Sequence, residues 1–257
     1  MDWAAQYEAL GQLAKAGEEL TFGQNFFFKF YQAFIYADRW QQYLEGVGTT
    51  LLVTAAALTL GVLLGTLVAL VRTAHDQQRP SRKNFVLGVV NFFCKIYVTV
   101  IRGTPMMVQL LIMGMVIFAS SRNFTLVGVL TLGINSGAYV SEIIRGGLMS
   151  VDPGQMEAGR SLGLNYVTTM RIIVVPQAIK AVLPALGNEF IILLKDTSLI
   201  TVIGGKELLY AAQGVMNRTY EAMFPLLGIA CIYLVLVLIL TWLLDKFERR
   251  LRQSDRR

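Results

Sequence analysis

Long apolar runs without a charged residue alternate with short polar segments along the chain. Residues 46–71, 123–141 and 222–244 contain no Asp, Glu, Lys or Arg. A helix that crosses a hydrocarbon core of roughly 30 Å needs about 20 apolar residues, so each run predicts one membrane span. Residues 85–121 and 181–204 are also apolar but contain two and three charged residues. The pattern predicts an all-α membrane protein with five or six spans.

Residues 85–121 can form either one long kinked span or a hairpin of two spans. A hairpin would turn at residues 102–105, which leaves too little chain to satisfy the free backbone groups of two helix ends near the membrane. We therefore expect one span, broken or kinked by Gly103 and Pro105, because proline removes a backbone donor and clashes with the preceding turn. Five spans result, and charge does not separate five from six.

The composition agrees with a location in lipid. Hydrophobic residues make up 54% of the chain and charged residues only 16%, whereas a soluble domain carries about 25% charged residues. The net charge of +6 would suit nucleic acid, but in a membrane protein basic residues report topology, so we expect no nucleic-acid partner. Cys94 and Cys231 lie inside apolar runs and are expected to be small buried hydrophobes, with no role in a disulfide or metal site.

Basic residues also set the expected orientation. They are concentrated in a central loop (residues 150–180) and after the last span, which places both in the cytoplasm. The N-terminus and residues 206–221 are then outside. The cations expected inside are Arg72, Arg79, Arg82 and Lys83 after the first span, Arg145, Arg160, Arg171 and Lys180 around the central loop, and those from Lys246 onward.

The chain is expected to divide into three parts. Residues 1–43 form an extracytoplasmic or interfacial segment, residues 44–248 the membrane domain and residues 249–257 a basic cytoplasmic tail. Ten aromatic residues fall within 22–43, which is typical of a helix at the membrane interface; a poorly ordered tail is the alternative. The start of the chain lacks the basic residues and short apolar core of a cleaved signal peptide.

The central loop predicts two short helices. Asp152 can cap a helix that begins at Pro153 and ends at Gly163. A second helix can begin at Asn165 and stop at Pro176. Such a pair would leave apolar side chains uncovered, so a protein partner is implied. These side chains are Met156, Leu162, Met170 and Ile172.

Motifs in and around this loop resemble the permeases of ABC importers. Glu157-Ala158-Gly159, with Gly163 four residues on, is similar to the Glu-Ala-Ala loop of that family. Gly159 stands where the family has alanine, a change that loosens a helix by up to about 1 kcal/mol. Similarity to the polar amino-acid subgroup (histidine, glutamine and arginine permeases) extends over residues 46–250. It includes IRGTP at 101–105, AYVSEIIRGG at 138–147 and LKDTSL at 194–199.

The resemblance implies a type I importer (MetI-like) permease fold with cytoplasmic coupling helices, in a bacterial inner membrane. It implies that the chain is not an enzyme and holds no cofactor, because ATP and Mg are bound by a dimer of partner ATPases. A second permease, identical or different, and an extracytoplasmic amino-acid-binding protein would complete the importer. In that family the first helix of the loop docks on the ATPase. The docking residues would be Glu157, Ala158, Gly159, Arg160 and Gly163, with Arg160 as a charge contact.

Ionisable residues inside the spans are candidate cargo contacts, because each costs about 2.5–3.5 kcal/mol to insert at the bilayer centre. Glu189 and Asp196 are seven residues apart and share one helix face. This acidic stripe can line a central path and meet the ammonium group or a cationic side chain of an amino acid. Alternatively, Lys195 or Arg102 neutralises Asp196 and only holds helices together. Nearby hydrogen-bonding groups are Asn188, Thr197 and Ser198.

Polar residues in other spans extend this candidate path. Arg102, next to the break at Thr104, can bind a substrate carboxylate, or it can snorkel to the membrane surface. Glu142 and Arg145 are three residues apart and can pair on one helix face, mainly as a structural contact. The remaining candidates are Asn135, Ser136 and Tyr139, which can equally be helix-packing residues.

Other classes of function fit the sequence less well. Gly204-Gly205-Lys206 lacks the first glycine and the hydroxyl residue of a phosphate-binding loop, so ATP must be bound elsewhere. An intramembrane enzyme with Ser136 as nucleophile needs a base, and the one histidine, His75, lies in a polar loop, so we expect no catalytic site. The main alternative is an ATP-independent cation or amino-acid channel, but a channel does not need a docking loop.

Overall fold

The computed structural model describes residues 2–78 and 84–254, with side chains described up to residue 250. The described residues form helices joined by short loops. Three of the cations expected after the first span, Arg79, Arg82 and Lys83, lie outside the described residues, as does the end of the basic tail from residue 255. The final helix continues into the tail as far as Ser254.

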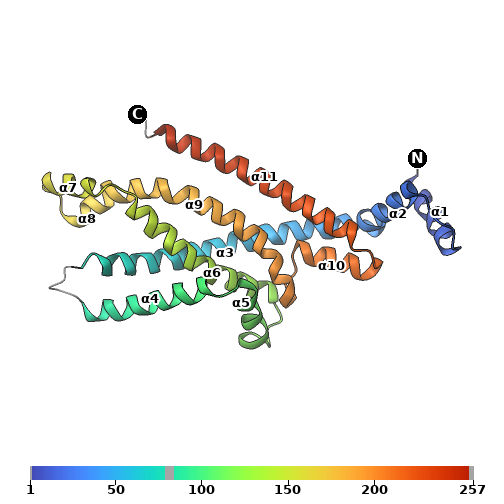
Figure 1. The fold of residues 1–257 in the computed structure, drawn as a ribbon, viewed down its shortest axis with the longest axis horizontal. Helices are drawn as coiled ribbons and strands as arrows, with labels where there is room; N and C mark the ends of the chain where they lie inside the picture. The colour runs from blue at the N-terminus through green and yellow to red at the C-terminus, as the bar shows by residue number, and fades with distance from the viewer. Residues whose placement is uncertain (1, 79–83, 255–257) are drawn as a thin grey trace.

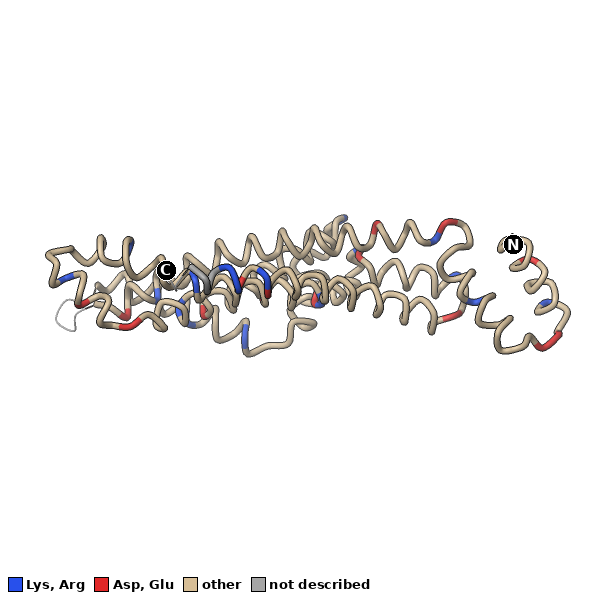
Figure 2. The backbone as a smooth tube through the Cα atoms, turned by 90° about the horizontal axis from the view of Figure 1, so that it is seen from above, with Lys and Arg blue, Asp and Glu red and all other residues tan. Residues whose placement is uncertain are grey.

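Five helical stretches are long and apolar enough to cross a membrane, which confirms the predicted number. They extend broadly along the long axis of the molecule (Figure 1). Long uncharged stretches separate the charged residues along the tube in Figure 2. The five are α3 (Arg39–Asp76), α4 (Phe85–Gly103), α6 (Phe124–Met149), the stretch Tyr166–Ile203 that contains α9 (Val175–Asp196), and α11 (Met223–Ser254).

Close packing of α3 against α6 forms the centre of the bundle. A Cβ added to Gly61 would lie 2.8 Å from the Ser136 Cβ, and one added to Gly65 would lie 2.7 Å from the Val140 Cβ. Small residues at a crossing let membrane helices approach closely and gain van der Waals contact. The glycines of α3 therefore set how near the polar groups of α6 lie to the core.

One span with a break at Gly103 and Pro105 is confirmed, but the span ends at the break and does not extend to residue 121 as expected. Helix α4 ends at Gly103, and a separate short helix follows, made of α5 (Met106–Ile112) and the π-helical turn η2 (Met113–Ile117). Thr104 is extended (φ −120°, ψ 146°) because the residue before a proline avoids the helical region. The second piece is too short to count as a span, so the hairpin of two spans is not formed either.

The N-terminal segment is a helical hairpin, and the expected single helix over residues 22–43 is wrong. Helices α1 (Trp3–Lys15) and α2 (Phe22–Phe34) precede the short 3-10 turn η1 (Tyr36–Asp38). Ala37 and Asp38 have positive φ angles of 53° and 54°, so the helical path breaks there and α3 starts in a new direction. The hairpin lies at one end of the molecule and the central loop at the other (Figure 1).

The central loop carries α7 (Pro153–Ser161) and α8 (Tyr166–Thr169), which confirms two helices, but Pro176 does not stop the second. A π-helical turn, η3 (Met170–Val174), joins α8 directly to α9. Pro176 lies in the first turn of α9, where a missing N–H is tolerated. The wider turn shifts the hydrogen-bond register there, which is a recognised way to pass a proline without ending a helix.

Beyond α9 the chain forms a 3-10 segment, η4 (Thr197–Ile203), and helix α10 (Leu208–Thr219). Gly204 has φ 86°, which lets the backbone reverse between them. Ile200 and Ile203 of η4 are buried in the same core cluster as Leu110 and Leu132. The second half of the chain is thereby fixed to α5 and α6.

Candidate functional site

Local signals define both ends of α7. The Asp152 Oδ1 accepts a hydrogen bond from the Gly154 N–H at 2.7 Å, and Pro153 occupies the first position. At the other end the Leu164 N–H donates to the Gly159 oxygen (3.1 Å) and the Gly163 N–H to the Arg160 oxygen (3.0 Å). These two bonds, with Gly163 at φ 79°, form a Schellman cap. The predicted bounds of the first helix are confirmed, and Gly163 shapes the turn.

Helix α7 packs so tightly on the following helix that a side chain at residue 159 has no room. A Cβ added to Gly159 would lie 2.4 Å from the Thr169 Cγ2 and 3.2 Å from the Ile173 Cδ1. Gly159 is buried, whereas its neighbours Glu157, Ala158 and Arg160 are exposed. The glycine that departs from the family pattern therefore faces the inside of the central loop, and its predicted part in docking would be through the shape of α7.

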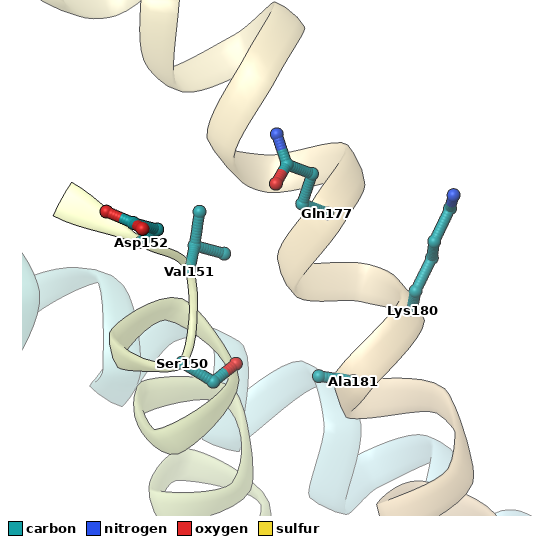
Figure 3. Close-up of a pocket in the computed structure, with 6 residues that line it drawn as sticks. All are labelled: Ser150, Val151, Asp152, Gln177, Lys180 and Ala181. Carbon is teal, nitrogen blue, oxygen red and sulfur yellow. The ribbon is translucent and has the colours of Figure 1, made fainter. Parts of the chain in front are cut away.

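Two of the four apolar side chains expected to be uncovered in the loop are exposed, and two are not. Leu162 and Ile172 are 80% and 62% exposed. Met156 and Met170 are half-buried and instead line a groove of about 1260 Å³ between the end of α3 and helices α7 and α8. A second hollow of about 410 Å³ lies at the base of the loop against α9 (Figure 3). It is lined by Ser150, Val151, Asp152, Gln177, Lys180 and Ala181.

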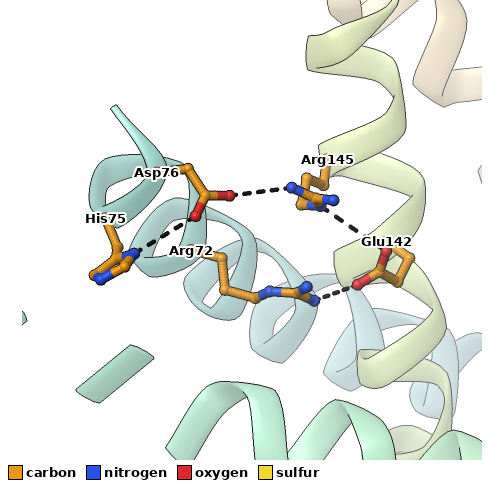
Figure 4. Close-up of polar contacts among 5 residues, drawn as sticks. All are labelled: Arg72, His75, Asp76, Glu142 and Arg145. Atoms are coloured by element: carbon orange, nitrogen blue, oxygen red, sulfur yellow. Dashed lines mark hydrogen bonds and ion pairs between the residues drawn. The ribbon is translucent and has the colours of Figure 1, made fainter. Parts of the chain in front are cut away.

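A cluster of four charged residues joins α3 to α6 beside the central loop (Figure 4). Arg72 pairs with Glu142, and the Arg145 Nη1 lies 3.1 Å from the Asp76 Oδ2. The predicted pair of Glu142 and Arg145 is present at 4.0 Å, but both residues have closer partners on α3. We call Arg72, Asp76, Glu142 and Arg145 the ionic cluster. Sequence spacing gave no signal for its two α3 members.

One further contact ties this end of α3 to the central loop. The Tyr166 hydroxyl of α8 donates to the Gln77 Oε1, one residue beyond Asp76 of the ionic cluster. His75 Nδ1 lies 3.5 Å from the Asp76 Oδ1. Movement of the loop would therefore act on the ionic cluster through adjacent residues.

Gln109, which was not among the predicted site residues, joins the break after α4 to α6. The Gln109 Nε2 donates to the Ile101 oxygen (2.8 Å) and the Thr104 Oγ1 (2.7 Å), while its Oε1 accepts from the Asn135 Nδ2 (2.9 Å). The Arg102 guanidinium carbon lies 5.2 Å from the centre of the Tyr139 ring. Three predicted site residues, Arg102, Thr104 and Tyr139, thus come together, and all three are exposed.

Glu189 is the buried member of the predicted acidic stripe. It is 6% exposed and accepts a hydrogen bond from the Ser136 hydroxyl at 2.8 Å. Asp196, the last residue of α9, is only half-buried, and Asn188 is exposed. Among the residues that the structure describes, neither Lys195 nor Arg102 lies within 4.0 Å of the Asp196 carboxylate as an ion pair. Ser136 is a buried partner of Glu189 in this conformation, not a lining group.

A second buried carboxylate, Glu207, was not among the predicted site residues. It is 1% exposed and caps α10, accepting from the Tyr210 N–H at 2.9 Å. Its Oε1 also accepts from the Thr201 hydroxyl (2.5 Å), and its Oε2 accepts from the Tyr233 hydroxyl of α11 (2.7 Å). An acidic residue just before an apolar helix could have indicated the cap, but not the burial.

Comparison with known proteins agrees with this architecture. The family model described as "Binding-protein-dependent transport system inner membrane component" matches residues 84–253. The glutamine transport system permease protein GlnP of Escherichia coli (strain K12) is 34% identical over 213 residues, covering 81% of this chain and 92% of its own length. A putative glutamine permease of Rickettsia typhi is 35% identical over 211 residues, with the same coverage.

Solved structures show the same fold. An amino acid ABC transporter, crystallised with histidines, superposes with a TM-score of 0.73 at 42% identity, over 82% of this chain and 94% of its own. The inward-facing MetNI methionine ABC transporter gives a TM-score of 0.69 at 17% identity, over 84% of this chain and 99% of its own, which supports the MetI-type fold alone.

These matches decide between the classes of function left open by the sequence. A component that depends on a binding protein is neither an ATP-independent channel nor an enzyme, and its transport system includes a separate ATPase and a binding protein. The chain is a multi-span protein of the inner membrane. It belongs to the family of binding-protein-dependent ABC transport permeases.

Proposed function

We propose that this permease carries a polar amino acid of the glutamine type, delivered by an extracytoplasmic binding protein, and that α7 docks on the ATPase. The single observation that carries the docking proposal is the exposure of Glu157, Ala158 and Arg160 on a short, rigidly capped helix at one end of the bundle. The cargo is suggested by the glutamine permeases among its relatives. We place α7 in the cytoplasm and the N-terminus outside, following the distribution of basic residues.

The working assembly is proposed to contain two permease subunits, identical or different, and two ATPase subunits that bind ATP and Mg. Closure of the ATPase dimer would draw the two α7 helices together. Because α8 contacts α3 through Tyr166 and Gln77, this movement would reach the ionic cluster and change the packing of α3 against α6. The path between the permeases would then open outward to receive the cargo.

The proposed cargo groups fall into two sets. Arg102, Thr104 and Tyr139 are exposed together, and the guanidinium can hold the α-carboxylate of the cargo by two parallel hydrogen bonds. Glu189 and Ser136 are bonded to each other, and contact with cargo requires that pair to open. Asn188 and Asp196 lie on the same helix nearer the surface. We assign carboxylate recognition to the first set and recognition of the ammonium group or side chain to the acidic residues.

The docking proposal is tested by Glu157→Lys in the complete transporter, reconstituted in vesicles with its ATPase and binding protein. We expect loss of ATPase association and of cargo-stimulated ATP hydrolysis, because a cation replaces the exposed carboxylate on α7. Glu18→Lys is the matched control, since Glu18 is also exposed but lies in the hairpin at the opposite end. If Glu157→Lys behaves like this control, α7 does not dock as proposed.

The cargo site is tested by Arg102→Gln in the same vesicles. Loss of a charged, two-point contact should raise the KM for glutamine uptake roughly tenfold, with little change in the ATPase rate at saturating binding protein. Lys95→Gln, another cation of α4, provides the comparison. An unchanged KM for Arg102→Gln would remove this residue from the cargo site.

A further inference from the structure

The N-terminal hairpin has one covered side and one uncovered side. Helix α1 covers the first: the Tyr7 ring stacks on those of Phe28 (4.8 Å between centroids) and Tyr31 (4.9 Å), and Trp3 meets Phe27 edge-on at 6.1 Å. These contacts lie within the hairpin itself. The aromatic residues on this side of α2 therefore need no other partner.

Four phenylalanines follow the other side of α2 at intervals of four residues, which places them on neighbouring turns of one face. We call Phe22, Phe26, Phe30 and Phe34 the phenylalanine stripe. Exposure rises steadily along it toward the hairpin turn: Phe34 is half-buried, Phe30 is 38% exposed, Phe26 52% and Phe22 89%. A gradient of this kind is expected where a helix leaves a packed bundle, and here it leaves the apolar side chains near the turn uncovered.

The stripe is joined to the membrane span α11 through Phe34 and Phe26. Gly228 makes room for the Phe34 ring, since an added Cβ would lie 2.4 Å from its Cζ, and the Phe26 ring meets Phe224 edge-on at 5.1 Å. The Lys29 Nζ also lies 2.7 Å from the Glu221 Oε2, just before α11. These contacts fix α2 against the start of that span.

The surface of α11 next to this contact is apolar and uncovered. Met223 is 53% exposed, Leu226 40% and Leu227 58%. In a membrane protein such a surface faces lipid or another span. The contact between Phe26 and Phe224 brings the phenylalanine stripe beside this surface, so the same medium can cover both.

From this continuity we propose that the phenylalanine stripe inserts into the bilayer surface on the side away from α7, with Phe22 and Phe26 among the headgroups and upper acyl chains. Aromatic residues favour that depth. The residues near the turn, Lys15, Glu18 and Glu19, are of mixed sign. Binding would therefore depend on the aromatic side chains more than on anionic lipid. The inference is independent of which cargo is carried.

Site-specific photo-crosslinking in the intact transporter tests this proposal. Phe22 is replaced by p-benzoylphenylalanine, which keeps an aromatic ring at a position without a packing role in the bundle, and membranes are irradiated in the presence of the binding protein. Gln12 in α1 is the matched control, because it is exposed and lies on the side of α1 away from Tyr7. Adducts are identified by intact-protein mass.

We expect a phospholipid adduct from residue 22 at roughly five times the yield from residue 12, since only the first would lie in lipid. Crosslinking of residue 22 to the binding protein or to a second copy of this chain would assign the stripe to a protein interface and overturn the proposal. So would equal lipid yields at the two positions. Uptake activity of each labelled complex confirms that it is folded.

Discussion

Carboxylates near the central loop are held by arginines, whereas the buried carboxylates of the interior are held by neutral donors. Glu142 and Asp76 of the ionic cluster pair with Arg72 and Arg145, and side chains of the cluster are up to 46% exposed. Glu207 is 1% exposed and bonded to hydroxyl and backbone N–H groups. Ion pairs in contact with water are weak and exchangeable, while a buried acceptor leaves its donors unsatisfied when it is removed.

This difference suits the two regions for different tasks. The ionic cluster lies between α3, α6 and the central loop, where contacts must re-form as the loop moves. The bonds of Glu207 join η4, α10 and α11 and favour a fixed frame for the membrane path. The two kinds of site should therefore respond differently to substitution and to salt.

Removal of the Glu207 carboxylate should have the largest effect on stability. Glu207→Ala deletes the cap of α10 and removes an acceptor from the buried Thr201 hydroxyl and from the half-buried Tyr233 hydroxyl. Together these losses amount to roughly 3 kcal/mol or more of unfolding free energy. The measurement is the unfolding of the purified permease titrated with denaturing detergent.

Glu207→Gln is the control for this prediction, because an amide oxygen can still accept from the Tyr210 N–H and the Thr201 hydroxyl. Its cost should be less than half that of alanine and should not change with ionic strength. A loss for Glu207→Ala of under about 1 kcal/mol would show that the carboxylate does not hold these elements together.

Removal of the Glu142 carboxylate should cost less, and its effect should depend on salt. In Glu142→Gln the mostly covered Arg72 guanidinium loses its charged acceptor, at a cost of about 1–3 kcal/mol. The difference from the parent should shrink as ionic strength rises, because exposed charges are screened. ATP-driven uptake should fall more than stability if the cluster transmits loop movement.

The double variant Arg72→Glu with Glu142→Arg distinguishes the effect of losing the ion pair from the effect of changing a single charge. Partial recovery of both stability and uptake is expected, since the two side chains can still meet. Equal losses for Glu142→Gln at low and high salt would place this pair with the buried, salt-independent contacts and remove the contrast between the two regions.

The Ser136 hydroxyl should matter because its partner is a buried carboxylate. Ser136→Ala leaves Glu189 without this donor, at a cost of about 1–2 kcal/mol. Ser141→Ala is the matched control on α6: its buried hydroxyl donates to the Ala138 oxygen in the same helix, so deletion leaves only a helix carbonyl. Equal effects in the unfolding titration would mean that the bond to Glu189 adds no stability.

Features that depend on a few adjacent residues, or on runs of apolar residues along the chain, could be predicted from the sequence. Long apolar runs, three of them free of charge, predicted five spans, and Asp152, Pro153 and Gly163 predicted α7, because caps act over a few residues. Pro176 misled the prediction since a π-helical turn carries the helix past it, and no residue type in that turn signals it in the sequence.

Contacts between distant residues could not be read from spacing. Arg72 and Glu142 are 70 positions apart, and their pairing follows from the close α3–α6 crossing allowed by Gly61 and Gly65. Glu189 and Asp196 lie on one helix as predicted, yet Glu189 is buried with a hydrogen bond to Ser136 of α6, whereas Asp196, at the end of α9, is half-buried. The periodicity gives the face of a helix but not which part of it a neighbour covers.

Asp76 and Arg145 form the most exposed pair of the ionic cluster. Substitution of Asp76 should therefore change the unfolding free energy least among the carboxylates compared here. Asp76 is 46% exposed and Arg145 32%, and Arg145 keeps a contact with Glu142 when Asp76 is neutralised. Asp76→Asn should therefore change the unfolding free energy by no more than about 0.5 kcal/mol. Its amide can still accept from Arg145, so ATP-driven uptake should stay close to that of the parent. A loss as large as that of Glu142→Gln would show that water does not weaken this pair, and the ionic cluster would then behave as one rigid unit instead of a joint.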